Sequence, residues 1–468
     1  MPKFRPVTSQ LVEELRLLVG KENVLTQQEE MQPYSHDEAP MPKPHVPELV
    51  VMPRDTTEVA KVLALANEVL IPVTPRGGGT GLSGGAIPIL GGIVLSLEKM
   101  NRIKEIDEDN FVAVVEPGVL LKDLYQAVES RGLYYPLYPG EKSAHVGGNV
   151  ATNAGGMRAV KYGVTRNFVL GLEAVLPTGQ IVRTGGKFVK CSTAYDLTQL
   201  LVGSEGTLAV ITEITLRLIT PPGWQEVVFI PFPGLRQAIK AVPEILKQAV
   251  PVMGLEFLEK DAIDIVEKDL GLELPFHEHD AFLLGILEGN SKEEVYQAAT
   301  RVAEVCTGNG AIDVYIPMSA KARRELLEAR EKLYPALKRT GPIEVIDVVV
   351  PRSQIASFVD MVKDISQRYR MPIVAIGHAG DGNVHLQPMG RGMDGGEWEA
   401  KLPRVMEEVY RAGVSLGGTI SGEHGLGFEK KKYLEIAMSR EQIALMARLK
   451  RAFDPNYILN PGKIFDEG

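Results

Sequence analysis

Three glycine-rich stretches between residues 76 and 212 constrain the fold of this chain more than any other feature. They read RGGGTGLSGG (76–85), PGEKSAHVGGNVATNAGGMRAVKYG (139–163) and GSEGTLAVIT (203–212). Because glycine has no side chain, successive backbone N–H groups in such loops can surround an anion without steric obstruction. One such loop alone is more typical of a surface turn. Three in one region predict a binding site for a large polar ligand.

The first loop formally contains the G-x-G-x-x-G pattern of nicotinamide-binding Rossmann domains, as Gly79, Gly81 and Gly84. A Rossmann site needs a helix to begin at this loop, because the helix N-terminus holds the pyrophosphate. The chain instead continues AIPILGGIVLSL (86–97), in which a proline and two glycines oppose a regular helix. The sequence therefore predicts an anion-binding loop outside a Rossmann fold.

The chain is long enough for two or three lobes, because 468 residues exceed what one hydrophobic core usually organises. After an N-terminal segment at 1–47, which has an amphipathic run at 11–19 and is irregular from residue 26 on, short β-branched runs alternate with helical stretches over 48–220, and Pro-Pro-Gly at 221–223 marks a boundary. A second lobe over 221–418 is predicted to be an open sheet with helices on one face, and 419–468 is expected to return to the first lobe. The expected helices include Thr56–Glu68, Leu120–Ser130, Leu235–Gln248, Lys292–Gly308, Ser319–Lys338 and Ile355–Tyr369.

Charge and cysteine content exclude several classes of function. The net charge of -9 provides no general cationic field for nucleic acid or anionic lipid. Cys191 and Cys306 are too few for a disulfide framework or an iron–sulfur cluster held by this chain alone, so a reducing cytoplasm is expected. Nowhere do about eighteen uncharged apolar residues run together, so no transmembrane segment is expected. Attachment to a membrane through a partner is left open.

Two histidines near the end of the second lobe are candidate metal ligands. In IVAIGHAGDGNVHLQPM (373–389), alternating apolar residues flank Asp381-Gly382, a dipeptide that favours a two-residue type I′ turn. Pairing outward from that turn places His378 directly opposite His385, with Cβ atoms about 5 Å apart. Two such imidazoles can hold a divalent ion, which Glu423 in TISGEHGLG (419–427) can complete. The alternative is a satisfied cross-strand histidine pair beside an unrelated surface turn.

Over residues 40–220, the order of the glycine loops resembles the FAD-binding domain of the vanillyl-alcohol oxidase superfamily, also called the p-cresol methylhydroxylase type. The resemblance implies that the first loop wraps the FAD diphosphate, the second lines the flavin ring and ribityl chain, and the third closes over the remainder. His145 is the one histidine in these loops that could attach flavin covalently, and non-covalent binding is expected. The residues implied in FAD binding are Arg76, Gly77, Gly78, Gly79, Thr80, Gly81, Ser83, Pro139, Gly140, Ser143, Gly147, Gly148, Asn149, Thr152, Asn153, Gly156, Glu205, Gly206, Ile211 and Asn460.

GHAGDGNVHL (377–386) and SGEHGLG (421–427) resemble the signature of the C-terminal domain of FAD-linked oxidases. That group includes D-lactate dehydrogenases, D-2-hydroxyglutarate dehydrogenase and the flavin subunit of glycolate oxidase. The resemblance implies that His378, His385 and Glu423 bind a divalent metal, zinc or manganese with iron as a further option. It also implies that His424 is the catalytic base.

Further residues follow from the same resemblance. Within LLEAREKLYPALKR (326–339), Arg330 aligns with the substrate arginine of the family, whose planar fork suits a carboxylate. The same expected helix offers the competing cations Arg323, Arg324, Lys332 and Lys338. Asn383 or Gln387 is expected to face the substrate. Asn460 or Lys463, in NPGKIF (460–465), is expected to approach the flavin ring.

Together the resemblances imply an α+β fold with a two-subdomain FAD-binding domain of the p-cresol methylhydroxylase type and a cap domain whose antiparallel sheet is covered by helices. They imply oxidation of a small D-2-hydroxy acid to the 2-oxo acid. The metal would polarise the hydroxyl, His424 would take its proton, and hydride would pass to flavin N5. The expected electron acceptor is an electron-transfer flavoprotein, an iron–sulfur subunit or a quinone system, and an oligomer is left open.

Three alternatives remain at this point. Hydroxyglutarate-specific members carry a lysine near the strand where this chain has Glu344-Val345-Ile346-Asp347, which favours the shorter acids D-lactate or glycolate over D-2-hydroxyglutarate. A zinc hydrolase with phosphate-binding glycine loops is an alternative of another class, although no HExxH helix supports it. A flavin-binding electron carrier without substrate chemistry is the third.

Overall fold

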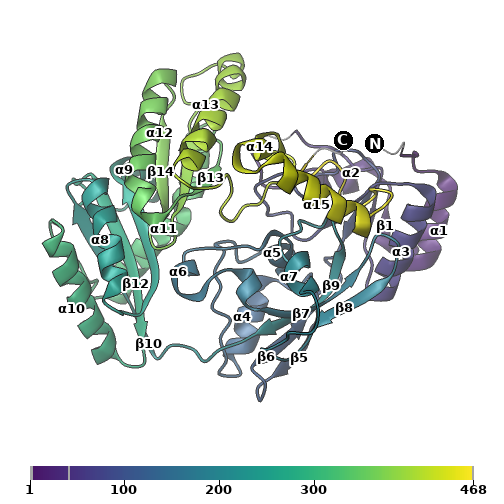
Figure 1. The fold of residues 1–468 in the computed structure, drawn as a ribbon, viewed down its shortest axis with the longest axis horizontal. Helices are drawn as coiled ribbons and strands as arrows, with labels where there is room; N and C mark the ends of the chain where they lie inside the picture. The colour runs from purple at the N-terminus through teal and green to yellow at the C-terminus, as the bar shows by residue number, and fades with distance from the viewer. Residues whose placement is uncertain (1–3, 41–42, 466–468) are drawn as a thin grey trace. The chain divides into compact units, whose positions relative to one another are not determined.

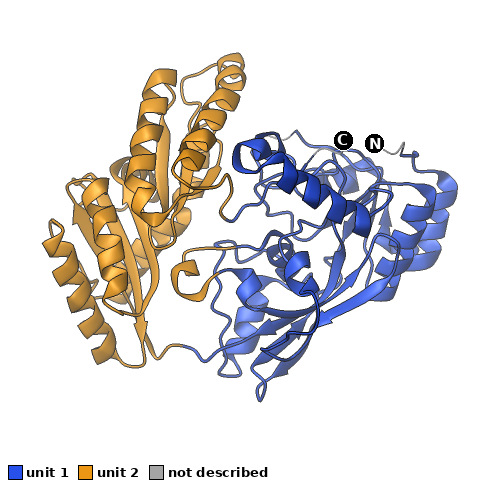
Figure 2. Cartoon of the chain, viewed as in Figure 1, with its two compact units in different colours: residues 1–154, 164–221, 423–468 blue, residues 155–163, 222–422 orange. Residues whose placement is uncertain are grey.

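The computed structural model describes residues 4–40 and 43–465, which divide into two compact units (Figure 1, Figure 2). Unit 1 contains the described residues of 1–154, 164–221 and 423–468, and unit 2 contains 155–163 and 222–422. The sequence predicted boundaries after residues 47, 220 and 418. The chain passes between the two units after residues 221 and 422, and also at both ends of 155–163.

The first sheet of unit 1 carries the strand that leads into the first glycine loop. Its order is β1-β2-β4-β3, with β2, β4 and β3 parallel and β1 antiparallel to β2. β3 ends at the first residue of that loop, so the loop begins where a buried strand stops. The bounds are β1 (Val24–Leu25), β2 (Leu49–Val51), β3 (Val73–Arg76) and β4 (Ile93–Ser96).

Helix α3 (Thr56–Val69) covers this sheet and shows why the local sequence is helical. Asp55 caps its start, accepting a hydrogen bond from Glu58 N at 2.9 Å. Its buried residues, among them Val59 and Leu63, recur at helical spacing and join one core with the sheet and with α1 (Ser9–Val19). The amphipathic run of the N-terminal segment therefore forms a helix that contributes to the core of unit 1.

The second sheet of unit 1 is antiparallel, with the order β5-β6-β9-β7-β8. Its central strand β9 begins at Val210, within the third glycine-rich stretch, so a buried strand anchors that loop as well. The bounds are β5 (Ile103–Asp107), β6 (Val112–Val115), β7 (Val169–Val175), β8 (Ile181–Gly185) and β9 (Val210–Arg217).

Residues 77–92, all of which the structure describes, contain no helix. The prediction that the first glycine loop does not open a Rossmann helix is therefore confirmed. The other helices of unit 1 are α2 (Gln28–Met31), α4 (Leu121–Glu129), α5 (Val146–Thr152), α7 (Leu197–Leu201), α14 (Leu434–Ala437) and α15 (Arg440–Phe453), with 3-10 turns η1 (Lys21–Asn23), η2 (Gln32–Tyr34), η3 (Thr165–Asn167) and η5 (Lys431–Tyr433).

Unit 2 is built on one sheet, antiparallel throughout, with the order β10-β12-β11-β14-β15-β13. The mixed α+β class and the antiparallel sheet of the second lobe are as predicted. The strands are β10 (Trp224–Phe232), β11 (Val252–Glu259), β12 (Ala281–Gly289), β13 (Ile346–Val349), β14 (Ile373–His378) and β15 (Asn383–Pro388). The helices are α6 (Ala159–Tyr162), α8 (Leu235–Lys247), α9 (Lys260–Leu270), α10 (Lys292–Gly308), α11 (Ala320–Arg339), α12 (Ile355–Tyr369) and α13 (Gly395–Ser415), with the 3-10 turn η4 (Arg352–Gln354).

Both faces of this sheet are buried, so the prediction of helices on one face alone is wrong. In β10, Val228, Phe229 and Ile230 are all inaccessible to solvent, although neighbours along a strand point to opposite faces. The Phe229 face packs against α9 and α11, and the remaining long helices, α8, α10, α12 and α13, also contact the sheet. A continuous apolar run such as VVFIPF, rather than an alternating one, is typical of a strand covered on both sides.

None of the helices in the described part of the chain is long and apolar enough to cross a bilayer.

The C-terminal segment is tied into unit 1 by a bridge to β3 and by a buried ion pair. Leu459 forms a parallel bridge with Val73. Lys450 Nζ donates to Asp454 Oδ2 and to the backbone carbonyls of Thr207, at 2.8 Å, and Leu459, at 2.7 Å. Lys450 is 4% exposed and Asp454 0%. Because a buried charge is costly without partners, these contacts hold the segment against the third glycine loop.

Replacing Lys450 with methionine should lower the free energy of unfolding of unit 1 by about 3–5 kcal/mol, because Asp454 is left as a buried unpaired charge. Urea unfolding followed by circular dichroism measures this change. Lys247→Met is the matched control, since its partner Glu244 is exposed and such pairs contribute about 0–1 kcal/mol. Equal losses in the two variants would contradict the anchoring role of Lys450.

Candidate functional site

The hairpin β14–β15 brings the two predicted histidines onto one face of the unit 2 sheet, but not in the predicted register. His378 pairs with Asn383, and His385 pairs with Ile376, so residues 379–382 form a four-residue loop. The direct pairing of His378 with His385, expected from an Asp381-Gly382 turn, is wrong. Because side chains alternate with a period of two, a shift of two residues keeps both imidazoles on the same face.

Neighbouring strands explain the longer loop. Gly380 N–H donates to Leu255 O at 3.0 Å, and Val350 N–H donates to Gly382 O at 3.0 Å. Gly382 has a φ of +97°, and a Cβ there would lie 2.1 Å from Val350 O. The hairpin loop therefore satisfies backbone groups of two flanking segments, an arrangement that a local turn rule does not contain.

The imidazoles of His378 and His385 face each other through the same type of nitrogen. Their Nε2 atoms are 3.3 Å apart and their rings are perpendicular, with centroids 5.1 Å apart. Both side chains are buried, at 5% and 7% exposure. The geometry turns both Nδ1 atoms away from the shared space and leaves the Nε2 atoms to meet there.

A buried carboxylate lies behind His378. Glu256, the residue directly opposite it on β11, accepts a hydrogen bond from His378 Nδ1 at 2.6 Å. Arg330 on α11 contacts the other oxygen of Glu256 through Nε at 2.8 Å and Nη2 at 2.7 Å. Burial acts to raise the pKa of Glu256, but the interactions with His378 and Arg330 outweigh it and hold that pKa below its ordinary value.

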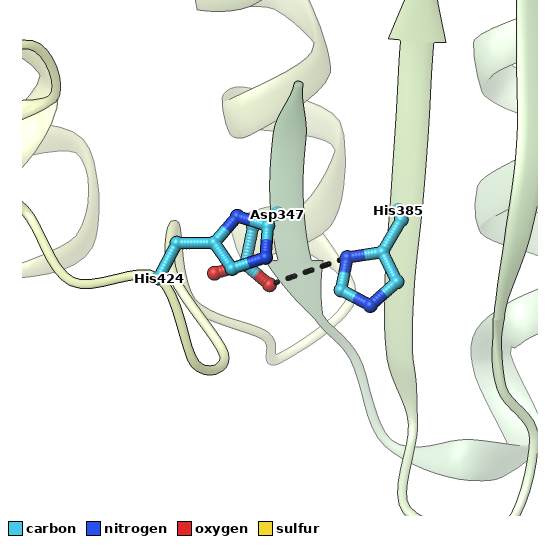
Figure 3. A group of neighbouring side chains, drawn as sticks. All are labelled: Asp347, His385 and His424. Carbon is cyan, nitrogen blue, oxygen red and sulfur yellow. Dashed lines mark ion pairs between the residues drawn. The ribbon is translucent and has the colours of Figure 1, made fainter. Parts of the chain in front are cut away.

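A second carboxylate lies behind His385. Asp347, directly opposite on β13, places Oδ1 3.8 Å from His385 Nδ1, the ion pair marked in Figure 3. Asn383 Nδ2 donates to the same oxygen at 2.7 Å. The other oxygen accepts from Ser421 Oγ at 2.8 Å and from Gly422 N at 2.9 Å. Asp347 therefore fixes both the hairpin and the last residues of unit 2.

Chain connectivity places the next predicted residues. Glu423 follows Gly422 directly, so its Cα lies about 3.8 Å from a residue that Asp347 holds. His424, also labelled in Figure 3, is one residue further along. Both belong to the segment 423–468 of unit 1.

Sequence reasoning missed Glu256 and Asp347, although both carry a signal. Each is an acidic residue inside an otherwise apolar strand, in GLEFLE (254–259) and EVIDVVV (344–350). Acidic residues are almost never fully buried unless they are paired, so such a residue in a core strand indicates a polar partner nearby. The partners here, His378 and His385, lie on strands that the sequence does not show to be neighbours.

In unit 1 the three glycine loops lie side by side. A Cβ on Gly77 or Gly78 would be 3.3 Å from the side chain of His145, which joins the first loop to the second. Glu205 N–H donates to Ala151 O at 2.8 Å, which joins the third loop to the second. The residues predicted to bind one large ligand are thus brought together within a single unit, except Gly156, which lies in the 155–163 segment of unit 2.

Several side chains that were predicted to bind FAD instead form hydrogen bonds within the protein or are buried in it. Arg76 donates to the backbone carbonyls of Pro33, at 2.9 Å, and His36, at 2.7 Å. Thr152 Oγ1 donates to Gly148 O, and Asn153 Oδ1 accepts from Arg166 N. Ser143 bonds Glu141, Asn149 is buried within α5, and Ile211 is buried in β9.

The C-terminal segment closes over the first and third loops. Glu205 accepts hydrogen bonds from Leu426 N at 2.8 Å and Gly427 N at 2.7 Å, while burial raises the pKa of this carboxyl. Asn460 Nδ2 donates to the carbonyls of Gly85 and Glu205. Lys463 Nζ donates to Gly85 O at 3.3 Å and to Ile87 O, just after the first loop, at 2.6 Å, and burial lowers its pKa to about 7. The structure therefore gives these residues a role in holding the loops.

Comparisons with known proteins agree with this arrangement. The family model for the FAD-binding domain matches residues 47–185, and the model for the C-terminal domain of FAD-linked oxidases matches residues 221–464. A D-lactate dehydrogenase of Anaerostipes hadrus is 42% identical, over 99% of this chain and 98% of its own length. Glycolate oxidase subunit GlcD of Bacillus subtilis is 38% identical, over 98% and 97%.

Solved structures show the same fold at lower identity. A crystal structure of p-cresol methylhydroxylase with substrate bound superposes with a TM-score of 0.82, covering 100% of this chain and 99% of the other at 18% identity. The two family models together match most of the sequence, and the paired histidines lie within one of the matched regions. This chain therefore belongs to the FAD-linked oxidases and is an oxidoreductase.

Proposed function

We propose that the protein oxidises a small D-2-hydroxy acid, D-lactate or glycolate, to the 2-oxo acid, using non-covalent FAD and a divalent metal ion. The observation that carries this proposal is the pair of buried imidazoles whose Nε2 atoms are 3.3 Å apart and whose Nδ1 atoms face carboxylates. The similarity to a D-lactate dehydrogenase and to a glycolate oxidase subunit supports the choice of substrate. Membership of the FAD-linked oxidases removes the zinc hydrolase as an alternative.

Open glycine positions in the second loop support an FAD site there. Gly147 is needed for packing, because a Cβ there would lie 2.4 Å from Pro117. Gly140 and Gly148 differ, since apart from chain neighbours and the local helix backbone no atom of the described residues lies within 4 Å of a Cβ at either position. His145 Nδ1 is buried and has no hydrogen-bond partner among the described residues. Bound FAD would occupy this space and supply a two-electron acceptor.

The donor set fits a divalent ion. Two nitrogens held tetrahedrally at zinc–nitrogen distances of about 2.0–2.1 Å lie about 3.3–3.4 Å apart, which matches the Nε2 separation of His378 and His385. Glu423 would be the third ligand, carried to the site by its neighbour Gly422. Zinc or manganese, with iron as a third option, would act as a Lewis acid there.

The protein's own residues would complete the reaction. His424 would accept the proton of the substrate 2-hydroxyl, and Arg330 would contact its carboxylate from the side not occupied by Glu256. Gln387 is 2% exposed and shares the sheet face of His385, so its amide would fix the orientation of the substrate.

The register of β13 favours a short substrate. Asp347 pairs with His385, so Val345 shares the face of the histidines and Glu344 points to the opposite face. A buried valine beside the site offers no charge for a second carboxylate, which disfavours D-2-hydroxyglutarate.

Electrons would leave through a separate acceptor. Two cysteines cannot hold an iron–sulfur cluster within this chain, so we propose an electron-transfer flavoprotein, an iron–sulfur subunit or a quinone system as the acceptor. We propose a cytoplasmic location, with attachment to a membrane only through such a partner.

Anaerobic addition of D-lactate or glycolate should bleach the flavin absorbance near about 450 nm, because the substrate reduces the bound cofactor. L-lactate is the control for stereochemistry, and D-2-hydroxyglutarate tests chain length. Rapid bleaching by D-2-hydroxyglutarate alone would contradict the substrate assignment, and a colourless protein that cannot be loaded with FAD would contradict the whole proposal.

Gly148→Ala should weaken FAD binding by about tenfold or more, because a methyl group there enters the space that we assign to the cofactor. The FAD-free protein should not be destabilised, since alanine is favoured over glycine inside a helix by about 0.5–1 kcal/mol. Equilibrium dialysis and urea unfolding separate the two effects. Gly308→Ala, at the end of α10 and also without close neighbours, is the matched control. Unchanged FAD affinity in Gly148→Ala would contradict the assignment of this space to FAD.

His424→Ala should keep its yellow colour and slow flavin reduction by about 10²–10⁴-fold, because a positioned base is lost while the cofactor loops are intact. Stopped-flow absorbance measures the reduction step alone. His277→Ala, a change of a partly exposed histidine on unit 2, should reduce at the wild-type rate. Wild-type reduction by His424→Ala would exclude this histidine as the base.

A further inference from the structure

Glu256 is an acidic residue at a fully buried position in a core strand, where a carboxylate needs polar partners. It lies in the middle of β11, is 0% exposed, and is the direct cross-strand neighbour of His378. Directly opposed residues of an antiparallel pair have Cβ atoms about 4.5–5.5 Å apart and share a face. The neighbouring positions Phe257 and Leu255 are buried apolar side chains of the opposite face.

Each oxygen of Glu256 has its own partner. Oε1 accepts from His378 Nδ1 at 2.6 Å, and Oε2 accepts from Nε and Nη2 of Arg330. Arg330 comes from α11, whose residues Ala329 and Leu333 pack in the core beneath it. A buried carboxylate held from two sides cannot rotate without breaking a charge-assisted hydrogen bond.

This contact determines which nitrogen of His378 can bind a metal. An ionised carboxylate only accepts hydrogen bonds, so Nδ1 must carry the proton of the neutral imidazole. Nε2 is then left with its lone pair, directed at the space shared with His385. A metal ion requires that lone pair, and second partners of this kind orient metal-bound histidines.

We infer that Glu256 is a positioning residue, which sets the tautomer and direction of His378 as a metal ligand while Arg330 holds Glu256 in place. The inference rests on the proposed metal site and adds the residue that prepares it. It also gives Arg330 a task within unit 2 that does not depend on substrate.

The same sheet contains a matched control. Glu226 on β10 is 1% exposed and accepts two hydrogen bonds from Arg323 of α11, both at 2.8 Å. This pair has the same residue types, the same helix and the same sheet as Glu256–Arg330, and it differs in having no histidine partner. Both Glu226→Gln and Glu256→Gln therefore remove a buried glutamate charge. Only Glu256→Gln also removes a contact that positions a histidine.

The test measures zinc affinity rather than turnover. FAD-loaded protein is stripped of metal, and its Zn²⁺ dissociation constant is measured by competition with a chromophoric chelator at one pH. In Glu256→Gln the amide can donate to Nδ1 and move the proton of His378 to Nε2, so affinity should fall about 10–100-fold. Glu226→Gln should stay within about twofold of wild type, since the expected effect travels only through the second partner of a ligand.

A second measurement needs no variant of Glu256. In metal-free protein labelled with ¹⁵N-histidine, the ring of His378, assigned by its absence in His378→Ala, should show the proton on Nδ1. A proton on Nε2 with a bare Nδ1 would overturn the inference even if Glu256→Gln failed to fold.

The outcomes separate the inference from the function on which it rests. Weakened zinc binding in Glu256→Gln alone supports the positioning role. Wild-type affinity in Glu256→Gln, or an equal loss in Glu226→Gln, overturns it and leaves the metal site standing. Wild-type protein that binds no Zn²⁺, Mn²⁺ or Fe²⁺ removes the metal site and the positioning role together.

Discussion

Charge buried inside a sheet must be matched by charge or hydrogen bonds, and unit 2 meets this requirement with one connected row of polar residues. The row runs from Arg330 through Glu256, His378 and His385 to Asp347. Each member is held by at least one neighbour, so the orientation of either imidazole depends on groups that need not touch a substrate. The helices, the strand order and the hairpin loop all serve to bring these side chains onto one face.

The glycine loops of unit 1 are held together in a different way from the buried row of unit 2. Its loops are largely backbone, and the polar side chains within them are used to tie loop to loop, as Arg76, Glu205 and Asn460 show. Backbone N–H groups and open glycine positions are then left to meet a ligand. Rigid loops with little side-chain bulk suit an extended, anionic cofactor better than a compact substrate.

Much of this architecture could be predicted from sequence because it depends on local patterns. The helices α3 and α12 follow from apolar spacing and begin where predicted, at Thr56 and Ile355. The glycine loops and both histidines were found from composition and motif. The hairpin register could not be found in this way, because the loop satisfies backbone groups of distant strands. Glu256 and Asp347 were not predicted as part of the site for the same reason, because only the strand order makes them neighbours of His378 and His385.

The separation along the chain of the residues in this row has a consequence for how the proposed metal ion would be bound during folding. His378 and His385 are 7 positions apart on one hairpin, whereas Glu256 is 122 positions from His378. Local contacts form early and distant strand pairings late, because closing a long loop costs entropy before any contact rewards it. A partly folded chain therefore has its two imidazoles together before their supporting carboxylates arrive. A metal ion bound at that stage would have flexible ligands that do not discriminate between ions. Selectivity for one ion would therefore require the completed sheet and not the hairpin alone.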